Sequence, residues 1–211
     1  MHQIMDANGG VIHSVREYDI AETTSVVVGA VVKLSEGLVV KAVAGETGAV
    51  LGVAAEAHTG TEDALNTRND GKKILVNDAP CAIFACPAPV LGADTGGNAT
   101  TVKFTGATGI GADAFNGGYI KDSTGAVRRI TDSAESTGAI TLTVETGKVV
   151  EEGETFVLYP PLGFNKGNLN SDATGIVLTA TASMSIKVVG RDEVTDEVWL
   201  MASKHALGND Q

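Results

Sequence analysis

The sequence predicts an all-β protein. Its apolar runs are short, rich in β-branched residues and separated by glycine-containing turns, a pattern typical of antiparallel strands joined by hairpins. Several segments alternate apolar and polar residues with a period of two, as in AITLTVE at 139–145. No segment has an apolar helical face longer than two turns. The chain of 211 residues is long enough to bury a core without disulfides or metals.

The stretch 25–56 carries the clearest strand pattern. Three apolar runs, at 26–34, 38–44 and 49–55, are separated by glycine-containing turns, so we expect three antiparallel strands in a meander. The first run is apolar on both faces and must be covered on both, as in a closed barrel or at a subunit contact. Val28 would then lie in a buried face, and Val28→Asp is expected to abolish folding.

The segments around this stretch are more polar. Residues 1–24 indicate an arm or a short edge strand, which could reach a neighbouring subunit. Residues 58–72 could hold at most one helical turn, at 62–66. Strands are expected at 73–77 and 82–85, with Pro80 in the turn between them. Pro87 and Pro89 follow and cannot continue a ladder, so they mark the best candidate domain boundary.

Between 90 and 162 the alternation becomes cleaner. Strands are expected at 101–105, 118–122, 126–131, 139–145 and 155–159. Pro160 and Pro161 close this segment as Pro87 and Pro89 open it, which predicts an inserted β module. Strands at 175–181, 184–189 and 197–202, with a turn at 190–192, should complete the first sheet. The expected organisation is an N-terminal arm at 1–24, a discontinuous small β-barrel or sandwich domain at 25–88 plus 166–211, and an inserted antiparallel β domain at 89–165.

The charge of the chain excludes one class of partner. The formal net charge is −11, and the 15 lysines and arginines are scattered along the sequence. An acidic surface repels phosphate backbones, so no direct nucleic-acid partner is expected. No apolar run approaches the roughly 20 residues that a spanning helix needs, and the first ten residues do not resemble a signal peptide. We therefore expect a chain made in the cytosol, with no membrane partner.

The sequence contains no convincing catalytic, cofactor-binding or metal-binding motif. The histidines lie far apart, without metal-ligating neighbours at i+2 to i+4, so we expect surface histidines and a neutral effect of His58→Ala; they are His2, His13, His58 and His205. This spacing leaves open a constellation assembled in space. The sequence GIGADA at 109–114 fits a loose dinucleotide loop, but it is followed by glycines and a strand instead of a helix. We expect no catalytic residue, no cofactor and no metal.

Three further features have structural explanations. Cys81 and Cys86 lie five residues apart in an extended segment, which places them on opposite faces, so we expect buried free thiols. The turn DTGGN at 94–98 lacks the ligands of a calcium loop and should be solvated. Trp199 and Met201 share one strand face, which indicates either a packed core or a subunit contact.

Two segments resemble a known family. The sequence GAVVKLSEGLVVKAVAGETGAVLGVAAEA at 29–57 resembles the small β-barrels of tailed-bacteriophage head decoration proteins. The segment 117–163 is similar to a β module that recurs in phage structural proteins. The resemblance implies a structural virion protein that binds the outside of the major capsid protein lattice, usually as a trimer or in clusters, and stabilises it against internal DNA pressure. It carries no functional residue over.

The sequence leaves an alternative open. A phage tail or fibre protein, or a glycan-binding β module, could have the same pattern of short strands and glycine-rich turns. A glycan binder needs exposed aromatic side chains, and Trp199 with three tyrosines is a thin supply. The strands that are apolar on both faces favour burial against identical subunits, and so a homotrimer or another small ring. We therefore predict a non-enzymatic capsid decoration protein located on the virion surface.

Overall fold

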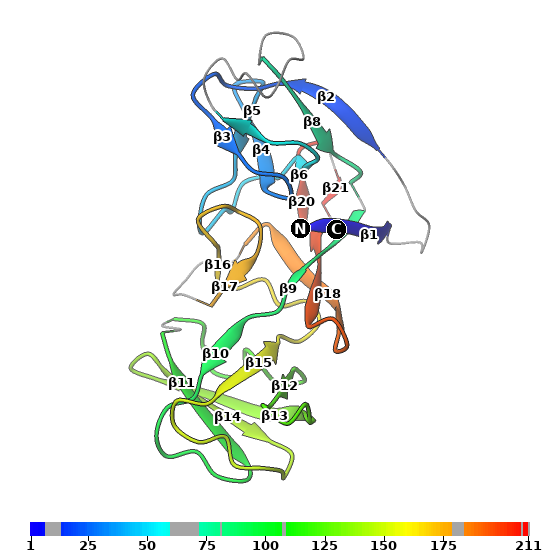
Figure 1. Cartoon of the computed structure of the whole chain (residues 1–211). Helices are drawn as coiled ribbons and strands as arrows, with labels where there is room; N and C mark the ends of the chain where they lie inside the picture. Colours follow the sequence, from blue (N-terminus) through cyan, green and yellow to red (C-terminus); the bar gives the residue numbers. More distant parts are fainter. Residues whose placement is uncertain are drawn as a thin grey trace.

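The computed structural model describes residues 1–6, 14–59, 72–80, 82–106, 109–178, 184–207 and 209–210. Its regular secondary structure consists of strands, and these residues contain no helix, so the all-β prediction is confirmed. Three open sheets stack along an elongated molecule, with five strands at one end, four in the middle and six at the other end (Figure 1). No described helix is long and apolar enough to cross a membrane.

The five-stranded sheet contains the stretch around which the sequence is organised. Its order is β2 (Val15–Asp19), β8 (Lys73–Asn77), β6 (Gly52–Ala54), β4 (Val31–Ser35) and β5 (Leu38–Lys41). All neighbours are antiparallel, as expected. However, β4 lies between β5 and β6, so the three strands do not form a meander. The connection 42–51 is long enough to pass the end of β4 and place β6 on its other side.

The predicted strand at 26–34 is wrong, because the chain turns in its middle. Strand β3 (Ser25–Val26) pairs with β7 (His58–Thr59), and β4 starts only at Val31. Gly29 has a φ of +83°, and a Cβ there would lie 2.5 Å from the backbone of Met1. The turn leaves Val28 60% exposed, so its predicted burial is wrong as well.

Within this sheet, β6 and the start of β4 are covered on both faces, as predicted for the runs that contain them. The adjacent residues Val31 and Val32 are both buried, and so is all of β6. The cover comes from the same chain, since Val53 of β6 packs in a small cluster with Ala79 of the connection after β8 and with Ala82 and Phe84 of β9. A second subunit is therefore not needed to bury these faces.

The four-stranded sheet joins segments from both ends of the chain. Its order is β1 (His2–Asp6), β9 (Ala82–Pro87), β19 (Glu197–Ala202) and β18 (Ile186–Asp192). β1 and β2 are both edge strands of the chain's own sheets, which matches the edge-strand alternative for residues 1–24.

The predicted turn at 190–192 is also wrong, because β18 continues to Asp192. The strand carries an irregularity between Val188 and Gly190, where a Cβ would lie 2.5 Å from the Trp199 ring. The carboxylate of Asp192 accepts the backbone N–H of Val194, which fixes the turn at 193–196 instead.

The six-stranded sheet is built from residues 90–159 alone. Its order is β10 (Val90–Gly92), β15 (Thr155–Tyr159), β12 (Tyr119–Lys121), β13 (Val127–Ser136), β14 (Ala139–Val144) and β11 (Thr101–Thr105). The sequence predicts β11 and β15 with these bounds. Phe104 meets the rings of Phe115 and Phe156 edge-on at centroid distances of 6.1 and 6.0 Å.

Two short pairs complete the described strands. They are β16 (Asn168–Leu169) with β17 (Ile176–Val177), and β20 (Lys204–His205) with β21 (Asn209–Asp210). The expected strand at 175–181 is seen as β17, while 179–181 and the expected helical turn at 62–66 lie outside the described residues. One connected cluster of buried apolar residues runs through the six-, four- and five-stranded sheets. The division into an inserted and a discontinuous domain stays a prediction.

Candidate functional site

The residues that could carry chemistry do not converge. No group of three or more His, Cys, Asp or Glu side chains in the described ranges could hold a metal ion. His13 and Cys81 lie outside those ranges, and the side chain of His2 is not described. The possible sites are therefore the remaining sequence candidates and the surfaces that the fold creates.

The expectation of surface histidines is wrong for His58 and His205, which are 1% and 5% exposed. The Nδ1 of His58 lies 2.8 Å from the carbonyl oxygen of Thr24. The Nδ1 of His205 accepts the backbone N–H of Leu207 at 3.1 Å. Both rings are thus held by backbone groups inside the fold. Sequence spacing could not reveal this, because burial of an isolated histidine depends on which strands close over it.

Cys86 is a buried free thiol, as predicted. Burial raises the pKa of this thiol to about 12. The thiolate is the reactive form of cysteine, so a raised pKa makes Cys86 a poor nucleophile. The prediction of buried thiols is confirmed for Cys86.

The glycine loop at 109–111 binds a carboxylate of its own chain. The backbone N–H groups of Gly109 and Gly111 donate to the two carboxylate oxygens of Glu135, at 2.5 and 2.7 Å. These two hydrogen bonds hold the pKa of Glu135 below its usual value. A strand follows the turns after this loop, with no helix between them. The amides that a pyrophosphate would need are already occupied, which agrees with rejection of a dinucleotide site.

The turn at 94–98 is closed by the Asn98 side chain and by backbone hydrogen bonds. The side-chain oxygen of Asn98 accepts both the N–H and the hydroxyl of Thr100, at 2.8 and 3.0 Å. The backbone N–H of Asp94 donates to the carbonyl of Lys103. This arrangement is an Asx turn that starts β11, and it does not resemble a calcium loop.

The aromatic side chains are engaged inside the fold. The hydroxyl of Tyr18 donates to Asp78, and that of Tyr159 donates to Asp196 at 2.5 Å. The guanidinium of Arg191 lies 3.7 Å above the ring of Tyr119. Trp199 is half-buried over Gly190. The described tyrosines and tryptophan therefore offer no flat exposed platform for a sugar ring.

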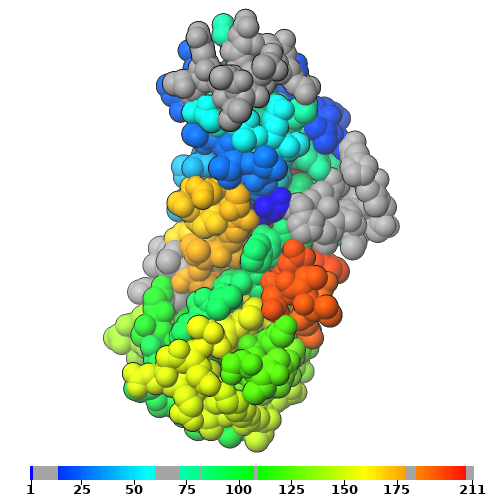
Figure 2. Space-filling model, viewed as in Figure 1, coloured from blue at the N-terminus to red at the C-terminus, as the bar shows by residue number. Residues whose placement is uncertain are grey.

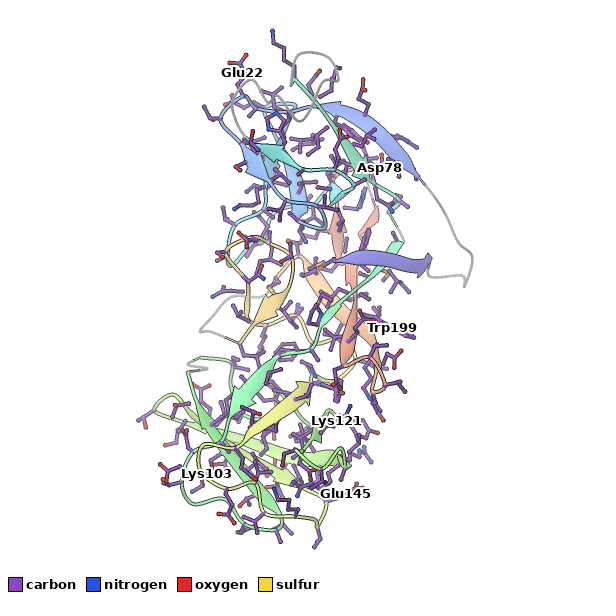
Figure 3. The ribbon with its side chains drawn as sticks, viewed as in Figure 1. Glu22, Asp78, Lys103, Lys121, Glu145 and Trp199 are labelled. Carbon is purple, nitrogen blue, oxygen red and sulfur yellow. The ribbon has the colours of Figure 1, made fainter. Side chains whose placement is uncertain are left out.

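A polar cluster joins the six-stranded sheet to the β18–β19 turn. The Nζ of Lys121 donates to the carbonyl of Glu193 at 2.9 Å and to the carboxylate of Asp196 at 2.8 Å. The hydrogen bonds from Lys121 and Tyr159 lower the pKa of Asp196. Lys121 and Trp199 lie on the two sides of this junction (Figure 3). The cluster holds the two sheets together, and its charges are mutually satisfied.

A groove of about 310 Å³ lies beside this junction. One wall is the segment around β10, and the other is the hairpin of β16 and β17. The lining is mainly apolar, with two polar side chains on the hairpin; it comprises Pro87, Ala88, Pro89, Val90, Leu91, Asn170, Thr174, Gly175, Ile176, Val177 and Leu178. In Figure 2 the residues of the two walls, coloured green and gold, lie in the middle part of the molecule.

β10 presents an open edge to this groove. The carbonyl of Pro89 accepts from Leu158, and the N–H of Ala93 donates to Glu154, so both point toward β15. In an antiparallel ladder the direction alternates from residue to residue, so the backbone groups of Val90 and Gly92 point away from β15. β10 is the terminal strand of its sheet, and no described residue bonds these outward groups.

The rim of the groove is apolar and exposed. Val90 is 64% exposed and Val177 37% exposed. The turn that carries Val28 adjoins the hairpin, since the carbonyls of Gly29 and Thr174 both accept from the amino group of Met1. The sequence marked Pro87 and Pro89 as a boundary but gave no sign that the returning hairpin would face them. Comparisons with protein-family models, with curated proteins and with solved structures find no match for this chain.

Proposed function

We propose that the protein is a structural virion protein that binds and stabilises the outer surface of a phage capsid. The single observation that carries a binding role is the groove beside the open edge of β10. The phage assignment rests on the family resemblance of the segments 29–57 and 117–163. We propose no catalytic role, since His58, His205 and Cys86 are buried and no metal-ligand group forms among the described residues.

The groove fits an extended segment of the capsid protein. Such a segment adds to a sheet edge through main-chain hydrogen bonds, while alternate side chains enter apolar pockets. The outward N–H and C=O groups of Val90 and Gly92 supply the hydrogen bonds, and the apolar walls receive the side chains. The proline residues before Val90 limit the open edge to a few residues, which suits a short docked segment.

The charge of the chain constrains the partner. A net charge of −11 favours a partner surface that presents lysine and arginine, and disfavours packaged DNA. A lattice of capsid subunits separates the proposed position of this protein from the DNA, so the acidic surface carries no penalty there.

The alternative of a glycan-binding module has less support. Sugar binding relies on exposed aromatic faces, whereas Tyr18, Tyr119 and Tyr159 are engaged by neighbouring side chains. Retention of the protein on a glycan array would favour this alternative.

The test uses a proline that removes one outward donor. Val90→Pro deletes the N–H that points into the groove and leaves the ladder with β15 intact, because the Val90 N–H does not face β15. Val90→Thr retains the N–H and nearly the same shape, and serves as the matched control. Cosedimentation with empty capsids of the phage that encodes the protein should fall about tenfold in affinity for Val90→Pro, because a buried partner carbonyl loses its donor.

The control variant should bind within about twofold of the natural protein, since its backbone is unchanged. Equal binding by both variants would exclude the β10 edge as the docking site. No binding of the natural protein to capsids, with retention on a glycan array, would overturn the capsid role.

A further inference from the structure

His205 lies where the end of the chain docks on the five-stranded sheet region. A parallel bridge pairs Val50 with His205. The Val50 N–H donates to the carbonyl of Lys204 at 3.0 Å, and the Ala206 N–H donates back to Val50 at 2.8 Å. The ring of His205 sits beneath this bridge with only 5% of the residue exposed. The docking of residues 204–207 therefore depends on the protonation state of the His205 ring.

The ring has a defined protonation state. Its Nδ1 accepts the backbone N–H of Leu207 at 3.1 Å, so the ring is neutral and carries its proton on Nε2. A second proton would have to bind Nδ1, directly against the N–H of Leu207. Two donors cannot share one hydrogen bond, so protonation removes the contact that holds Leu207.

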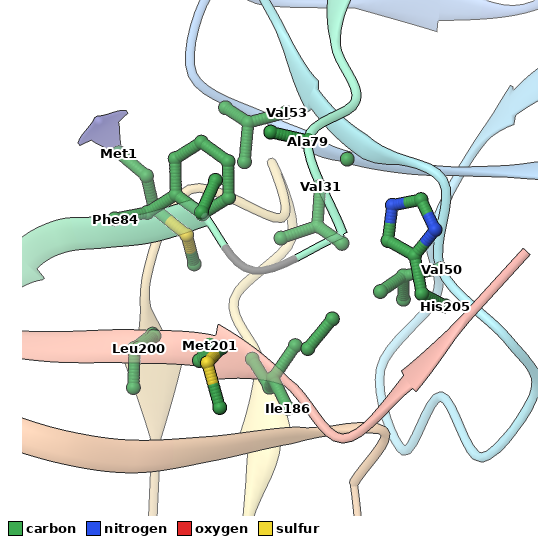
Figure 4. A pocket seen from close by; sticks show the side chains of 13 residues that line it. Met1, Val31, Val50, Val53, Ala79, Phe84, Ile186, Leu200, Met201 and His205 are labelled. Atoms are coloured by element: carbon green, nitrogen blue, oxygen red, sulfur yellow. The ribbon is translucent and has the colours of Figure 1, made fainter. Parts of the chain in front are cut away.

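The other side of the ring offers little compensation. Nε2 makes no well-aligned hydrogen bond within the described residues, although backbone groups of Leu51 and Asp78 lie near the ring, and the ring borders a cavity of about 20 Å³ between the sheets (Figure 4). The cavity is large enough for about one water, but its walls are almost wholly apolar. They include the side chains of Met1, Val31, Val50, Val53, Phe84, Ile186, Leu200 and Met201. An imidazolium here would be poorly solvated.

One acidic group opposes this effect. The Asp78 carboxylate, on the connection after β8, attracts a proton on His205, and backbone groups of Leu51 and Asp78 act in the same direction. That carboxylate is already held by Ser14, Tyr18 and Arg16. The strands β4, β6, β18 and β19 present only apolar side chains at the cavity; Met1 directs its amino group to other carbonyls, and Lys204 is exposed. Burial prevails, and it lowers the pKa of His205 below its ordinary value.

We propose that His205 is an acid-sensitive latch whose protonation releases residues 204–207 from Val50 while the three large sheets stay folded. The latch is closed when the ring is neutral and opens when the ring binds a proton. Because the folded state disfavours the proton, docking is fully present above the unfolded pKa of histidine and is lost as the pH falls below it. This inference does not depend on the proposed capsid role.

The test follows hydrogen exchange of single amides by NMR between pH 7.5 and 4.5, corrected for intrinsic exchange. Protection of the Val50 and Ala206 amides should fall about tenfold per pH unit between the ordinary pKa of histidine and the lowered pKa of the folded state, because one proton is taken up on opening, and it should level off at lower pH. The Ile120 and Leu142 amides in the six-stranded sheet serve as internal references and should keep their protection over the same range.

His205→Asn separates the latch from general acid effects. An Asn oxygen can accept the Leu207 N–H as Nδ1 does, but it does not titrate in this range. The variant should show weaker protection that no longer changes with pH. If it does not fold, the ring pKa of the natural protein, read from its proton resonances, decides the matter. A pKa at or above about 6.5, an unchanged slope in His205→Asn, or parallel loss of protection at Ile120 would each overturn the proposal.

Discussion

Single residues in this protein are governed by which strands close over them. The burial of Cys86 was predicted correctly from the sequence, whereas the burial of His58 was not. Apolar neighbours correctly predict that Cys86 is buried, because its own strand β9 is apolar along most of its length. His58 lies in a polar stretch, and its burial comes from the pairing of β7 with β3, which no local pattern indicates.

Cys86 should label slowly in the native protein. Burial raises the pKa of its thiol to about 12, so the thiolate fraction near neutral pH is very small. Titration with a chromogenic disulfide reagent, with and without denaturant, measures this, and peptide mapping separates Cys86 from Cys81. Native labelling of Cys86 at the rate of a free exposed thiol would contradict its buried position.

The expected effects of two substitutions are reversed by the structure. His58→Ala should reduce the free energy of unfolding by about 2–4 kcal/mol. The substitution leaves a cavity at a buried position and removes the hydrogen-bond partner of the Thr24 carbonyl. Val28→Asp should change it by less than about 0.5 kcal/mol, because Val28 is 60% exposed in a turn. Urea unfolding of both variants checks this contrast. Greater damage from Val28→Asp would restore the original strand assignment.

At the level of elements, local alternation predicted strands better than it predicted their neighbours. β8, β11, β15 and β19 have the predicted bounds, since each is flanked by a clear turn. The sequence pattern does not predict the end of β3 at Val26, because Gly29 lies within an apolar run. The turn at Gly29 depends on its contact with Met1, a residue distant in the sequence. Strand order, and the groove between β10 and the 170–178 hairpin, depend on contacts between distant segments, which periodicity does not encode.

One ion pair ties β4 to the connection that follows β5. The Nζ of Lys33 lies 2.7 Å from a carboxylate oxygen of Glu46, whose other oxygen accepts the N–H of Gly48 at 2.9 Å. Burial of Glu46 opposes its ionisation, but the hydrogen bonds from Lys33, Gly48 and Val43 prevail and lower its pKa. The folded state therefore binds the Glu46 proton more weakly than the unfolded state. Its contribution to stability is present above the ordinary pKa of glutamate and is lost as the pH falls through the lowered value.

Glu46→Gln should therefore reduce the free energy of unfolding at pH 7 by about 3 kcal/mol, since it leaves Lys33 without its buried partner. The difference from the natural protein should shrink as the pH approaches 3. Urea titrations at several pH values measure it. Glu152→Gln, at an exposed position, is the matched control and should be neutral throughout. A pH-independent loss in Glu46→Gln would show that packing, not charge, is responsible.

At the scale of the whole molecule, the fold class was predictable from the sequence, whereas the cover of the apolar faces was not. The all-β class follows from the period-two alternation. The inference of a subunit contact from strands that are apolar on both faces fails, because the chain covers β4 and β6 itself. The remaining support for a homotrimer is the family resemblance, together with the exposed valines around the groove.

A homotrimer should sediment with three times the 21.5 kDa mass of one chain. Sedimentation equilibrium at several concentrations measures this mass directly. If the groove rim takes part, Val177→Asp should dissociate the assembly, whereas Val194→Asp, at a 90% exposed position in the β18–β19 turn, should not. A monomer at every concentration would restrict self-association to the capsid surface or exclude it.

The sheets differ in when they can form during synthesis. All six strands of the β10–β15 sheet lie within residues 90–159, whereas β9 waits for β19, more than a hundred residues later. On the ribosome, the six-stranded sheet can therefore close while β9 has only β1 beside it and still lacks β19. Pairing across so long a loop is slow, so refolding should have a fast phase from the six-stranded sheet and a slower one from the four-stranded sheet. The junction of Lys121 and Asp196 can form only when the β18–β19 turn reaches the six-stranded sheet, so it reports that these two parts of the molecule have joined.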